Sequence, residues 1–194
     1  MKKTLYLKFV LAYVIFGIFG FIIITTFVPS MTMEQLTREK ANALYSEATL
    51  IADNYVSGLY TNDTSLEAVK MQLDIFSVYL DSVIWIINPS GRLILSTDAP
   101  LNVEEVVMIE NFDPTITAGS YYNIGTFFDS YESDMLNIIV PITSEYKVKG
   151  YLVVHTSMTG IEKSCNSLLN ISYITLCILF LLSLIILIFF TEIV

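Results

Sequence analysis

Two stretches of the chain, one near each end, are almost continuously apolar. Residues 9–28 contain no charged residue, and 14 of the 20 are Ile, Leu, Val or Phe. Residues 171–190 also lack charge and include 15 Ile, Leu or Phe. Twenty helical residues rise about 30 Å, which is the thickness of the hydrocarbon core of a bilayer. The pattern therefore predicts two transmembrane helices, over residues 9–28 and 169–191.

The first apolar stretch also resembles a signal peptide, because Lys2, Lys3 and Lys8 precede it. It is longer than the usual apolar region of about 7–15 residues, however, and no small-residue cleavage site follows it. We therefore favour an uncleaved anchor, with the lysines holding the N-terminus in the cytoplasm. This predicts a cell-membrane protein with two spans, in which residues 1–8 and 192–194 are cytoplasmic and residues 29–168 form one extracytoplasmic domain.

The segment after the first span has the period of an amphipathic helix. Pro29 is expected to end the span, and a long helix is expected to resume by Met33. An apolar stripe then recurs at three- and four-residue steps, formed by Leu44, Ala48, Ile51, Tyr55 and Leu59. The stripe is compatible with packing on its own domain or against a second copy of the chain, and we favour a shared membrane-proximal part.

A second amphipathic helix is predicted after a short loop. Thr64 and Glu67 have the spacing of a capping box, and the apolar positions that follow recur at helical spacing from Leu66 to Leu80. A short helix is also expected at Val103–Ile109. Thr159 and Glu162 form another capping box, which predicts a last helix running into the second span.

Between these helices the period changes to that of strands. Ser82–Asn88 and Arg92–Thr97 flank an Asn-Pro-Ser-Gly sequence, so we predict a β-hairpin closed by a type I turn. Pro141 predicts a strand end or a sheet edge at its position, because proline cannot donate a hydrogen bond to a neighbouring strand. Three further strands are expected at Tyr121–Phe128, Met135–Thr143 and Gly150–Thr156.

Composition and charge exclude several classes of protein. Apolar residues make up 54% of the chain and charged residues 15%, which excludes a disordered chain. The net charge of −9 has the wrong sign for a nucleic-acid partner. The predicted outer domain holds 18 acidic and 7 basic residues, so it carries the negative charge. Cys165 and Cys177 are too far apart along one helix to form a disulfide.

Nothing in the sequence predicts catalysis by this chain. It has one histidine, His155, and lacks a nucleophile elbow, an H-E-x-x-H motif and a glycine-rich phosphate loop. We therefore expect no catalytic residue, no metal site and no cofactor. The acidic run Glu104, Glu105, Glu110 and Asp113 is compatible with divalent-cation binding, but we favour a solvated acidic face.

Several aromatic residues in the strand region have two interpretations. Large rings dominate protein cores, but ligand pockets are also apolar and aromatic with a few polar groups. A strand histidine likewise has a structural interpretation, as a buried group that is hydrogen-bonded near the end of a sheet. As candidate ligand-binding residues we select Trp85, Arg92, Tyr121, Tyr122, Phe128, Asp129 and His155.

The order of elements, with the sequences at residues 86–97, 139–142 and 150–161, resembles the PAS-like single Cache sensor domain of bacterial receptors. The resemblance covers about residues 30–165. It implies an α+β fold with a central five-stranded antiparallel sheet and a long N-terminal helix. Residues 150–161 look like the final strand and exit helix of sensor histidine kinases from Gram-positive bacteria.

The resemblance also implies a function. We expect the domain to sense a small molecule, an ion or a peptide outside the cell and the chain to signal as a membrane homodimer. We interpret it as the sensor region of a bacterial receptor, a two-component histidine kinase. The alternatives are a chemoreceptor, a cyclic-dinucleotide enzyme, or a standalone membrane-anchored binding or assembly protein. Family members continue into an output module, whereas this sequence stops at Val194. It is therefore interpreted either as a truncated chain or as a standalone sensor. The expected signal-transmitting residues lie in the exit helix: Thr159, Glu162, Ser164 and Asn166.

Overall fold

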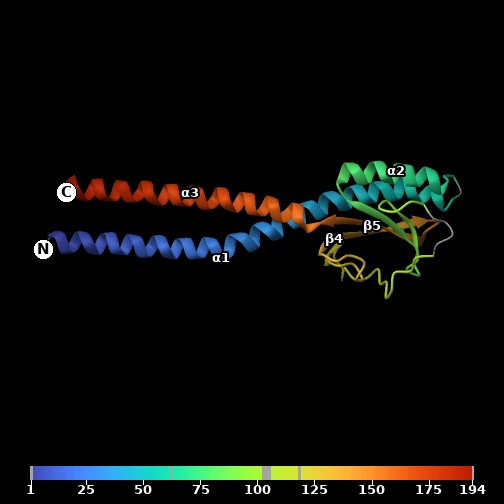
Figure 1. The fold of residues 1–194 in the computed structure, drawn as a ribbon, viewed down its shortest axis with the longest axis horizontal. Coiled ribbons are helices and arrows are strands. Elements are labelled where there is room, and N and C mark those ends of the chain that lie inside the picture. The colour runs from blue at the N-terminus through green and yellow to red at the C-terminus, as the bar shows by residue number, and fades with distance from the viewer. Residues whose placement is uncertain (1, 62, 102–105, 118, 194) are drawn as a thin grey trace. The chain divides into compact units, whose positions relative to one another are not determined.

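Figure 1 shows the computed structural model, which describes residues 2–61, 63–101, 106–117 and 119–193, with side chains from 8 to 189. The chain divides into two compact units, Met1–Leu36 with Gly160–Val194, and Thr37–Thr159. Its elements are α1 (Lys2–Ile51), a π-helical turn (Ala52–Val56), a 3₁₀ turn (Ser57–Leu59), α2 (Leu66–Leu80), β1 (Val83–Ile87), β2 (Leu93–Ser96), β3 (Tyr122–Gly125), β4 (Met135–Ser144), β5 (Lys147–Ser157) and α3 (Met158–Ile193).

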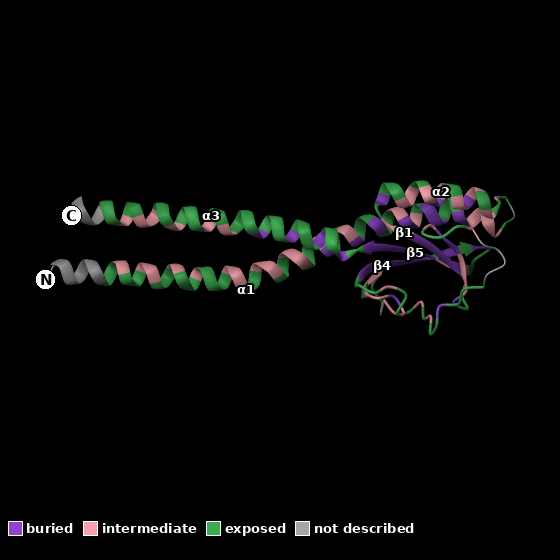
Figure 2. Cartoon of the chain, viewed as in Figure 1, coloured by how far each residue is buried: buried purple, intermediate pink, exposed green. Residues whose placement is uncertain are grey.

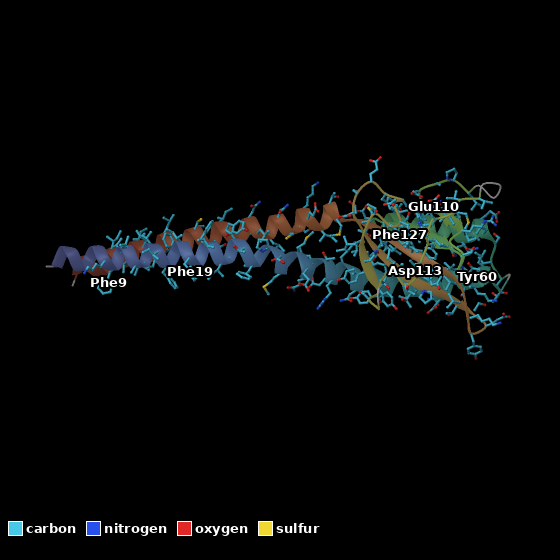
Figure 3. The ribbon with its side chains drawn as sticks, turned by 90° about the horizontal axis from the view of Figure 1, so that it is seen from below. Phe9, Phe19, Tyr60, Glu110, Asp113 and Phe127 are labelled. Carbon is cyan, nitrogen blue, oxygen red and sulfur yellow. The ribbon has the colours of Figure 1, made fainter. Side chains whose placement is uncertain are left out.

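The first unit is built from the apolar parts of α1 and α3. Two helical stretches, Lys8–Leu59 and Met158–Phe189, contain segments long and apolar enough to cross a membrane. Their side chains are largely exposed (Figure 2), and Phe9 and Phe19 are 59% and 62% exposed (Figure 3). Large apolar side chains exposed in this number are consistent with lipid contact and therefore with a membrane protein.

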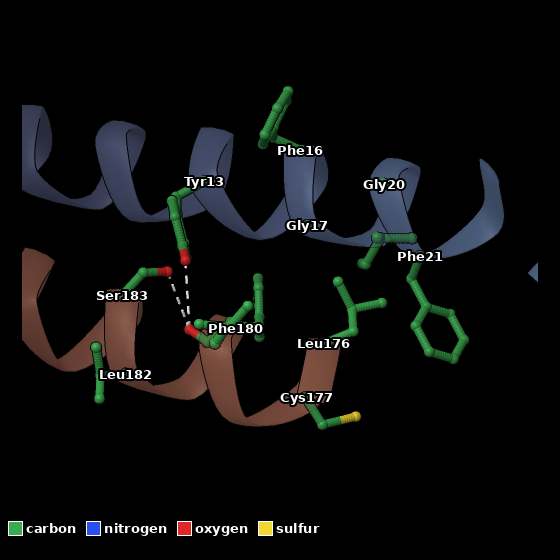
Figure 4. Close-up of a pocket in the computed structure, with 12 residues that line it drawn as sticks. Tyr13, Phe16, Gly17, Gly20, Phe21, Leu176, Cys177, Phe180, Leu182 and Ser183 are labelled. Atoms are coloured by element: carbon green, nitrogen blue, oxygen red, sulfur yellow. Dashed lines mark hydrogen bonds between the residues drawn. The ribbon is translucent and has the colours of Figure 1, made fainter. Parts of the chain in front are cut away.

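One contact in this unit depends on a glycine (Figure 4). The ring of Tyr13 stacks on Phe180 with centroids 5.3 Å apart, and the Tyr13 hydroxyl donates to the Phe180 carbonyl over 3.3 Å. A Cβ atom on Gly17 would lie 2.0 Å from Cε2 of Phe180, so this ring packs directly on the glycine backbone. A cavity of about 640 Å³ lies between the two helices beside this contact.

Helix α1 continues without interruption through Pro29, so the expected break before a helix that resumes by Met33 is wrong. Proline has no N–H, which removes one helical hydrogen bond to the carbonyl of Thr25. An interruption would leave several more backbone groups without helical partners than the single N–H that proline lacks. The hydroxyl of Thr26 also donates to the carbonyl of Ile22 over 2.8 Å, one turn before the proline.

The second unit begins with the end of α1 and with α2. Leu44, Ala48 and Ile51 of the apolar stripe are at most 2% exposed, so this part of the stripe is buried in its own domain. The N-cap of α2 is Ser65, whose Oγ accepts from the Ala68 N–H, and not the expected Thr64. The backbone N–H of Thr64 donates instead to the Gly58 carbonyl, which ties Thr64 to the preceding turn.

The five strands form one antiparallel sheet in the order β2-β1-β5-β4-β3, which confirms the predicted sheet. Strand β3 ends earlier than expected, because residues 127–129 turn into the left-handed region. Pro141 lies inside β4, but β3 pairs only as far as Ile138, so Pro141 is on an edge as predicted. Of the short helix expected at Val103–Ile109, residues 103–105 lie outside the described residues, and Met108 forms a β-bridge with Arg92.

Each face of the sheet is covered by a different layer. Ile84, Leu152 and Ile138 point to the face that is covered by α2 and the end of α1. Trp85, Val153 and Ile139 point to the opposite face, where loops cover them. Both sets are nearly fully buried (Figure 2). We call the segments over the second face, residues 106–117 and 126–131, the loop layer.

The predicted type I turn between β1 and β2 connects this hairpin to the loop layer. Gly91 N–H donates to the Asn88 carbonyl over 3.0 Å, and Asn88 Oδ1 accepts from the N–H groups of Ser90 and Arg92. Gly91 has a φ of +86°, and its carbonyl faces the loop layer, where it accepts a hydrogen bond from the Ile109 N–H. A Cβ atom on Gly91 would lie 2.9 Å from Cβ of Phe112 and 3.1 Å from the Ile109 carbonyl.

We predict that Gly91→Ala destabilises the domain more than Gly119→Ala. Both glycines have a left-handed φ, +86° and +87°, which costs an alanine about 1–2 kcal/mol. Only Gly91 is crowded, since nothing lies within 4 Å of a Cβ atom on Gly119. Crowding at a packed site should add about 1–3 kcal/mol to the loss of folding stability in Gly91→Ala. Urea unfolding followed by circular dichroism measures both variants, and equal losses of stability would contradict the packing described here.

Candidate functional site

The buried surface under the loop layer is rich in aromatic rings. Trp85, Phe127, Ile139 and Val153 form its core, and partly buried rings from the loops pack on them. Phe127 and Glu110 both belong to the loop layer (Figure 3). Trp85 contacts Phe127 edge-on with centroids 5.9 Å apart and stacks on Tyr131 at 5.6 Å. This face of the sheet is therefore an aromatic cluster covered by loops and not by helices.

His155 projects from β5 into this cluster and is fully buried. Its Nδ1 lies 2.7 Å from Oδ1 of Asn137 on the neighbouring strand. Asn137 donates through Nδ2 to the carbonyls of Gly125 and Met135, each at 3.1 Å. Because carbonyls only accept, the orientation of the Asn137 amide is fixed, and its Oδ1 accepts from a protonated Nδ1. The Nε2 atom of His155 is therefore an unprotonated acceptor.

The surroundings keep this histidine neutral. The centroids of Trp85, Phe127 and Tyr131 lie 4.6, 4.6 and 5.0 Å from the imidazole. Burial among these rings lowers the pKa of His155 to about 3, because a charged imidazole could not be hydrated there. Burial, with a smaller contribution from the charge of Asp98, raises the pKa of Tyr131, so its phenol also stays neutral.

Three polar atoms in this cluster have no hydrogen-bond partner among the described residues: Nε2 of His155, Nε1 of Trp85 and the hydroxyl of Tyr131. Such groups are rare in folded proteins, and each costs about 1–3 kcal/mol. Nε1 of Trp85 only donates and Nε2 of His155 only accepts, so together they offer both kinds of hydrogen bond. A donor and an acceptor without partners in the described part of the chain therefore lie buried within the aromatic cluster.

A strained turn holds part of the loop layer in place. Phe127, Phe128 and Asp129 have φ angles of 47°, 53° and 57°, three consecutive residues in the left-handed region. Each costs about 1–2 kcal/mol in a residue with a side chain. The turn is closed by a hydrogen bond from Tyr131 N–H to the Thr126 carbonyl, and Phe127 is 1% exposed. Burial of its ring, worth about 1.5–3 kcal/mol, offsets part of the strain, and strain of this kind concentrates at functional sites.

A cavity of about 560 Å³ opens beside this turn. Its walls are Trp85 and Leu93 of the first hairpin, residues 107–111 and residues 128–130. The volume lies within the range of about 300–1,000 Å³ that is usual for small-molecule sites. No group of three or more His, Cys, Asp or Glu side chains that could hold a metal ion is found among the residues described. The volume of the cavity fits a small organic ligand.

The structure brings four of the seven candidate ligand-binding residues to this place. Trp85, Phe128 and Asp129 line the cavity. His155 lies behind the cavity wall in contact with the Trp85 ring. Arg92 is half-buried next to the lining residue Leu93, but does not itself line the cavity.

Tyr121 and Tyr122 are not brought to the cavity. The Tyr121 hydroxyl donates to Asn42 of α1, and its ring contacts Tyr45. Tyr122 pairs with Ile138 in the sheet, so its side chain points to the helix-covered face. The sequence does not indicate which face of the sheet each tyrosine ring reaches, because that depends on the register of β3 against β4.

Sequence reasoning missed Asn137, Phe127, Tyr131 and the lining segment 107–111. The alternation of Asn137 with buried apolar residues in β4 is a signal that could have identified it, since a buried asparagine needs partners. The loop segments have no period, so nothing in the sequence indicates which of their residues point inward.

The expected signal-transmitting residues lie at the start of α3. Thr159, Glu162, Ser164 and Asn166 are exposed there. Ser157, and not Thr159, accepts the backbone N–H at the helix start, from Thr159 over 3.3 Å. The capping position is therefore two residues earlier than expected, because α3 begins immediately after β5.

Comparisons with solved structures find similar folds, while no protein-family profile and no curated protein sequence matches the chain. The ligand-binding domain of the Campylobacter jejuni chemoreceptor Tlp3 in complex with L-valine is 13% identical, with a TM-score of 0.50 over 84% of this chain and 66% of that one. The sensor domain of the V. cholerae histidine kinase DctB is 17% identical, with a TM-score of 0.47 over 69% of this chain and 56% of that one. The expected PAS-like sensor fold is confirmed. The chain spans less than two thirds of the length of either structure.

We predict that the buried neutral His155 makes the domain less stable in acid. The unfolded state takes up a proton near pH 6.5, but the folded state does so only near pH 3. Stability is therefore complete above pH 6.5 and is lost as the pH falls towards 3, by about 1.4 kcal/mol per pH unit. Between pH 6.5 and 4.5 the parent should lose about 2 kcal/mol more than His155→Asn, which keeps a donor for Asn137 but does not titrate.

Thermal unfolding of both proteins across this pH range measures the difference. The carboxylates titrate alike in the two proteins, so the difference between their pH profiles isolates the histidine. Parallel profiles would mean that His155 is charged or hydrated in the folded domain.

Proposed function

We propose that residues 1–194 are the membrane-anchored sensor region of a bacterial receptor. The domain over residues 29–168 lies outside the cell and binds a small ligand in the cavity under the loop layer. Ligand binding biases the domain between two arrangements through its differential affinity for them. The change is passed to the cytoplasm by α3, while both chain ends lie inside.

The observation that carries this proposal is the position of β5. This strand bears His155, which touches the cavity residue Trp85, and its last residue is followed at once by α3. A shift of the aromatic cluster on ligand binding acts on the strand from which this helix begins. No loop intervenes to absorb the shift.

For the output we propose a two-component histidine kinase, the protein class that the sequence of the last strand and exit helix resembles. A chemoreceptor is the second candidate, because the Tlp3 domain that shares this fold belongs to a chemoreceptor. The ligands of that domain are amino acids such as L-valine, so a small molecule is the class of ligand that we propose here.

We also propose that the receptor acts as a homodimer. The outer face of α2 carries four large apolar side chains with exposed fractions of 64–83%: Met71, Ile75, Val78 and Tyr79. Their spacing places them on one side of the helix. Two membrane-anchored copies have the same orientation, so the same stripe on each copy is available for contact with the other.

The orientation in the membrane is tested by cysteine labelling on intact cells. In a background of Cys165→Ser and Cys177→Ser, a cysteine at the exposed turn residue Ser90 should react with an impermeant thiol reagent. A cysteine at Thr4 should react only after the cells are broken. Labelling of both positions, or of neither, on intact cells would rule out this orientation.

Transmission through α3 is tested in a chimera that joins residues 1–194 to a known kinase module. Ser164→Gly with Asn166→Gly should leave ligand affinity nearly unchanged but abolish the change in phosphorylation on ligand addition, because two glycines cost about 1 kcal/mol each relative to alanine and loosen the helix. Ser164→Ala with Asn166→Ala removes the same side chains but keeps the helix, so it should respond like the parent. A full response from the glycine variant would show that the signal does not travel through this helix.

A further inference from the structure

The imidazole of His155 is covered by one short segment of the loop layer, residues 126–131. Its Nδ1 is hydrogen-bonded to an asparagine of the neighbouring strand β4, and its ring touches Trp85 of β1. Its other ring contacts are with Phe127 and Tyr131, which both belong to segment 126–131 and have centroids 4.6 and 5.0 Å from the imidazole. Displacement of this segment would therefore uncover the histidine and leave its strand in the sheet.

Segment 126–131 is built to open more easily than the strands beneath it. The Tyr131 N–H donates to the Thr126 carbonyl over 3.0 Å, and the Ser130 N–H donates to the Phe127 carbonyl over 3.1 Å. These hydrogen bonds join residues of the segment to one another, and the contacts with the sheet are made by its aromatic rings. Three consecutive left-handed residues strain the closed arrangement. Loops with such features open locally at a lower free energy than central strands do.

A positive charge on His155 would oppose the closed arrangement. Of the side chains described in contact with the imidazole, from β1, β4 and segment 126–131, only Tyr131 titrates, and its phenol stays neutral. Asp98 helps to raise the pKa of Tyr131, whereas burial alone lowers the pKa of His155. Among the described residues, therefore, no carboxylate compensates a proton on this histidine. In an open arrangement water would hydrate the imidazolium, and the pKa would return towards its ordinary value.

We propose that His155 and segment 126–131 form an acid-sensitive switch, in which protonation of His155 favours an open arrangement of the segment and changes the output through β5 and α3. The open arrangement binds a proton more tightly than the closed one, so acid shifts the equilibrium between them. His155 lies three residues before Met158, where α3 begins. This inference goes beyond the proposed function, because a proton acts as a second signal with no ligand in the cavity.

Hydrogen–deuterium exchange of the full chain in lipid nanodiscs measures the opening. Between pH 7 and 5 the opening constant of segment 126–131 should rise about 25-fold, after correction for intrinsic exchange, because His155 titrates near pH 6.5 when open and near pH 3 when closed. Residues 151–155 of β5 should stay better protected than the segment at each pH. Equal protection of the two regions would mean that the segment opens only when the whole domain unfolds, and would overturn the switch.

Two variants separate the charge of the histidine from the packing above it. His155→Asn does not titrate, so its opening constant should change less than about twofold over the same pH range. Phe127→Leu loosens the packing but keeps the histidine, so it should open up to about tenfold more at pH 7 and retain the 25-fold rise. The parent and Phe127→Leu give this result whether or not the histidine variant folds. A 25-fold rise in His155→Asn, or its loss in Phe127→Leu, would show that another group drives the opening.

The kinase chimera of residues 1–194 tests whether the opening reaches the output. Without any ligand, phosphorylation should change more between pH 7 and 5 in the parent chimera than in the His155→Asn chimera. The kinase module is the same in both, so the difference between their pH profiles belongs to the histidine. Equal profiles would mean that the opening is not a signal, and would overturn the switch. The proposed function is tested separately, by the response of the parent chimera to ligand at pH 7.

Discussion

Strand β5 pairs with a neighbour on each side, with β1 from Tyr151 to His155 and with β4 from Lys147 to Ser157. It therefore sets the register of the sheet and the face that each neighbouring side chain reaches. Its odd-numbered residues from 151 to 155 point into the aromatic cluster, and its even-numbered ones pack under the helices. Because α3 begins at the next residue after β5, the strand that carries the buried histidine also begins the exit helix.

The hydrogen bond between His155 and Asn137 is the polar centre of this arrangement. Asn137 is oriented by two backbone carbonyls, and it fixes the tautomer of His155 in turn. The histidine then supports the ring of Trp85, which is part of the cavity wall. A ligand that touches Trp85 therefore acts on a packed and hydrogen-bonded chain of contacts that ends at the central strand.

Most of the fold could be predicted from the sequence, because periodicity and turn chemistry are local. The spans, α2 and the first hairpin follow from spacing alone, and the Asn-Pro-Ser-Gly turn fixes the hairpin register. The break expected between Pro29 and Met33 is wrong, since one proline removes only a single helical hydrogen bond. The site was predicted in part: Trp85 and His155 lie in strands of clear alternation, whereas segment 107–111 and the turn at Phe127 depend on tertiary packing.

We propose that ligands bind against Trp85 under the loop layer. Trp85 is the only tryptophan in the chain, so its fluorescence reports on this cavity without labelling. The most direct measurement is acrylamide quenching of the full chain in nanodiscs, during titration with any compound that changes the output of a kinase chimera. We expect such a compound to shift the emission of Trp85 and to reduce its quenching in step with the output. An active compound that leaves both unchanged would contradict it.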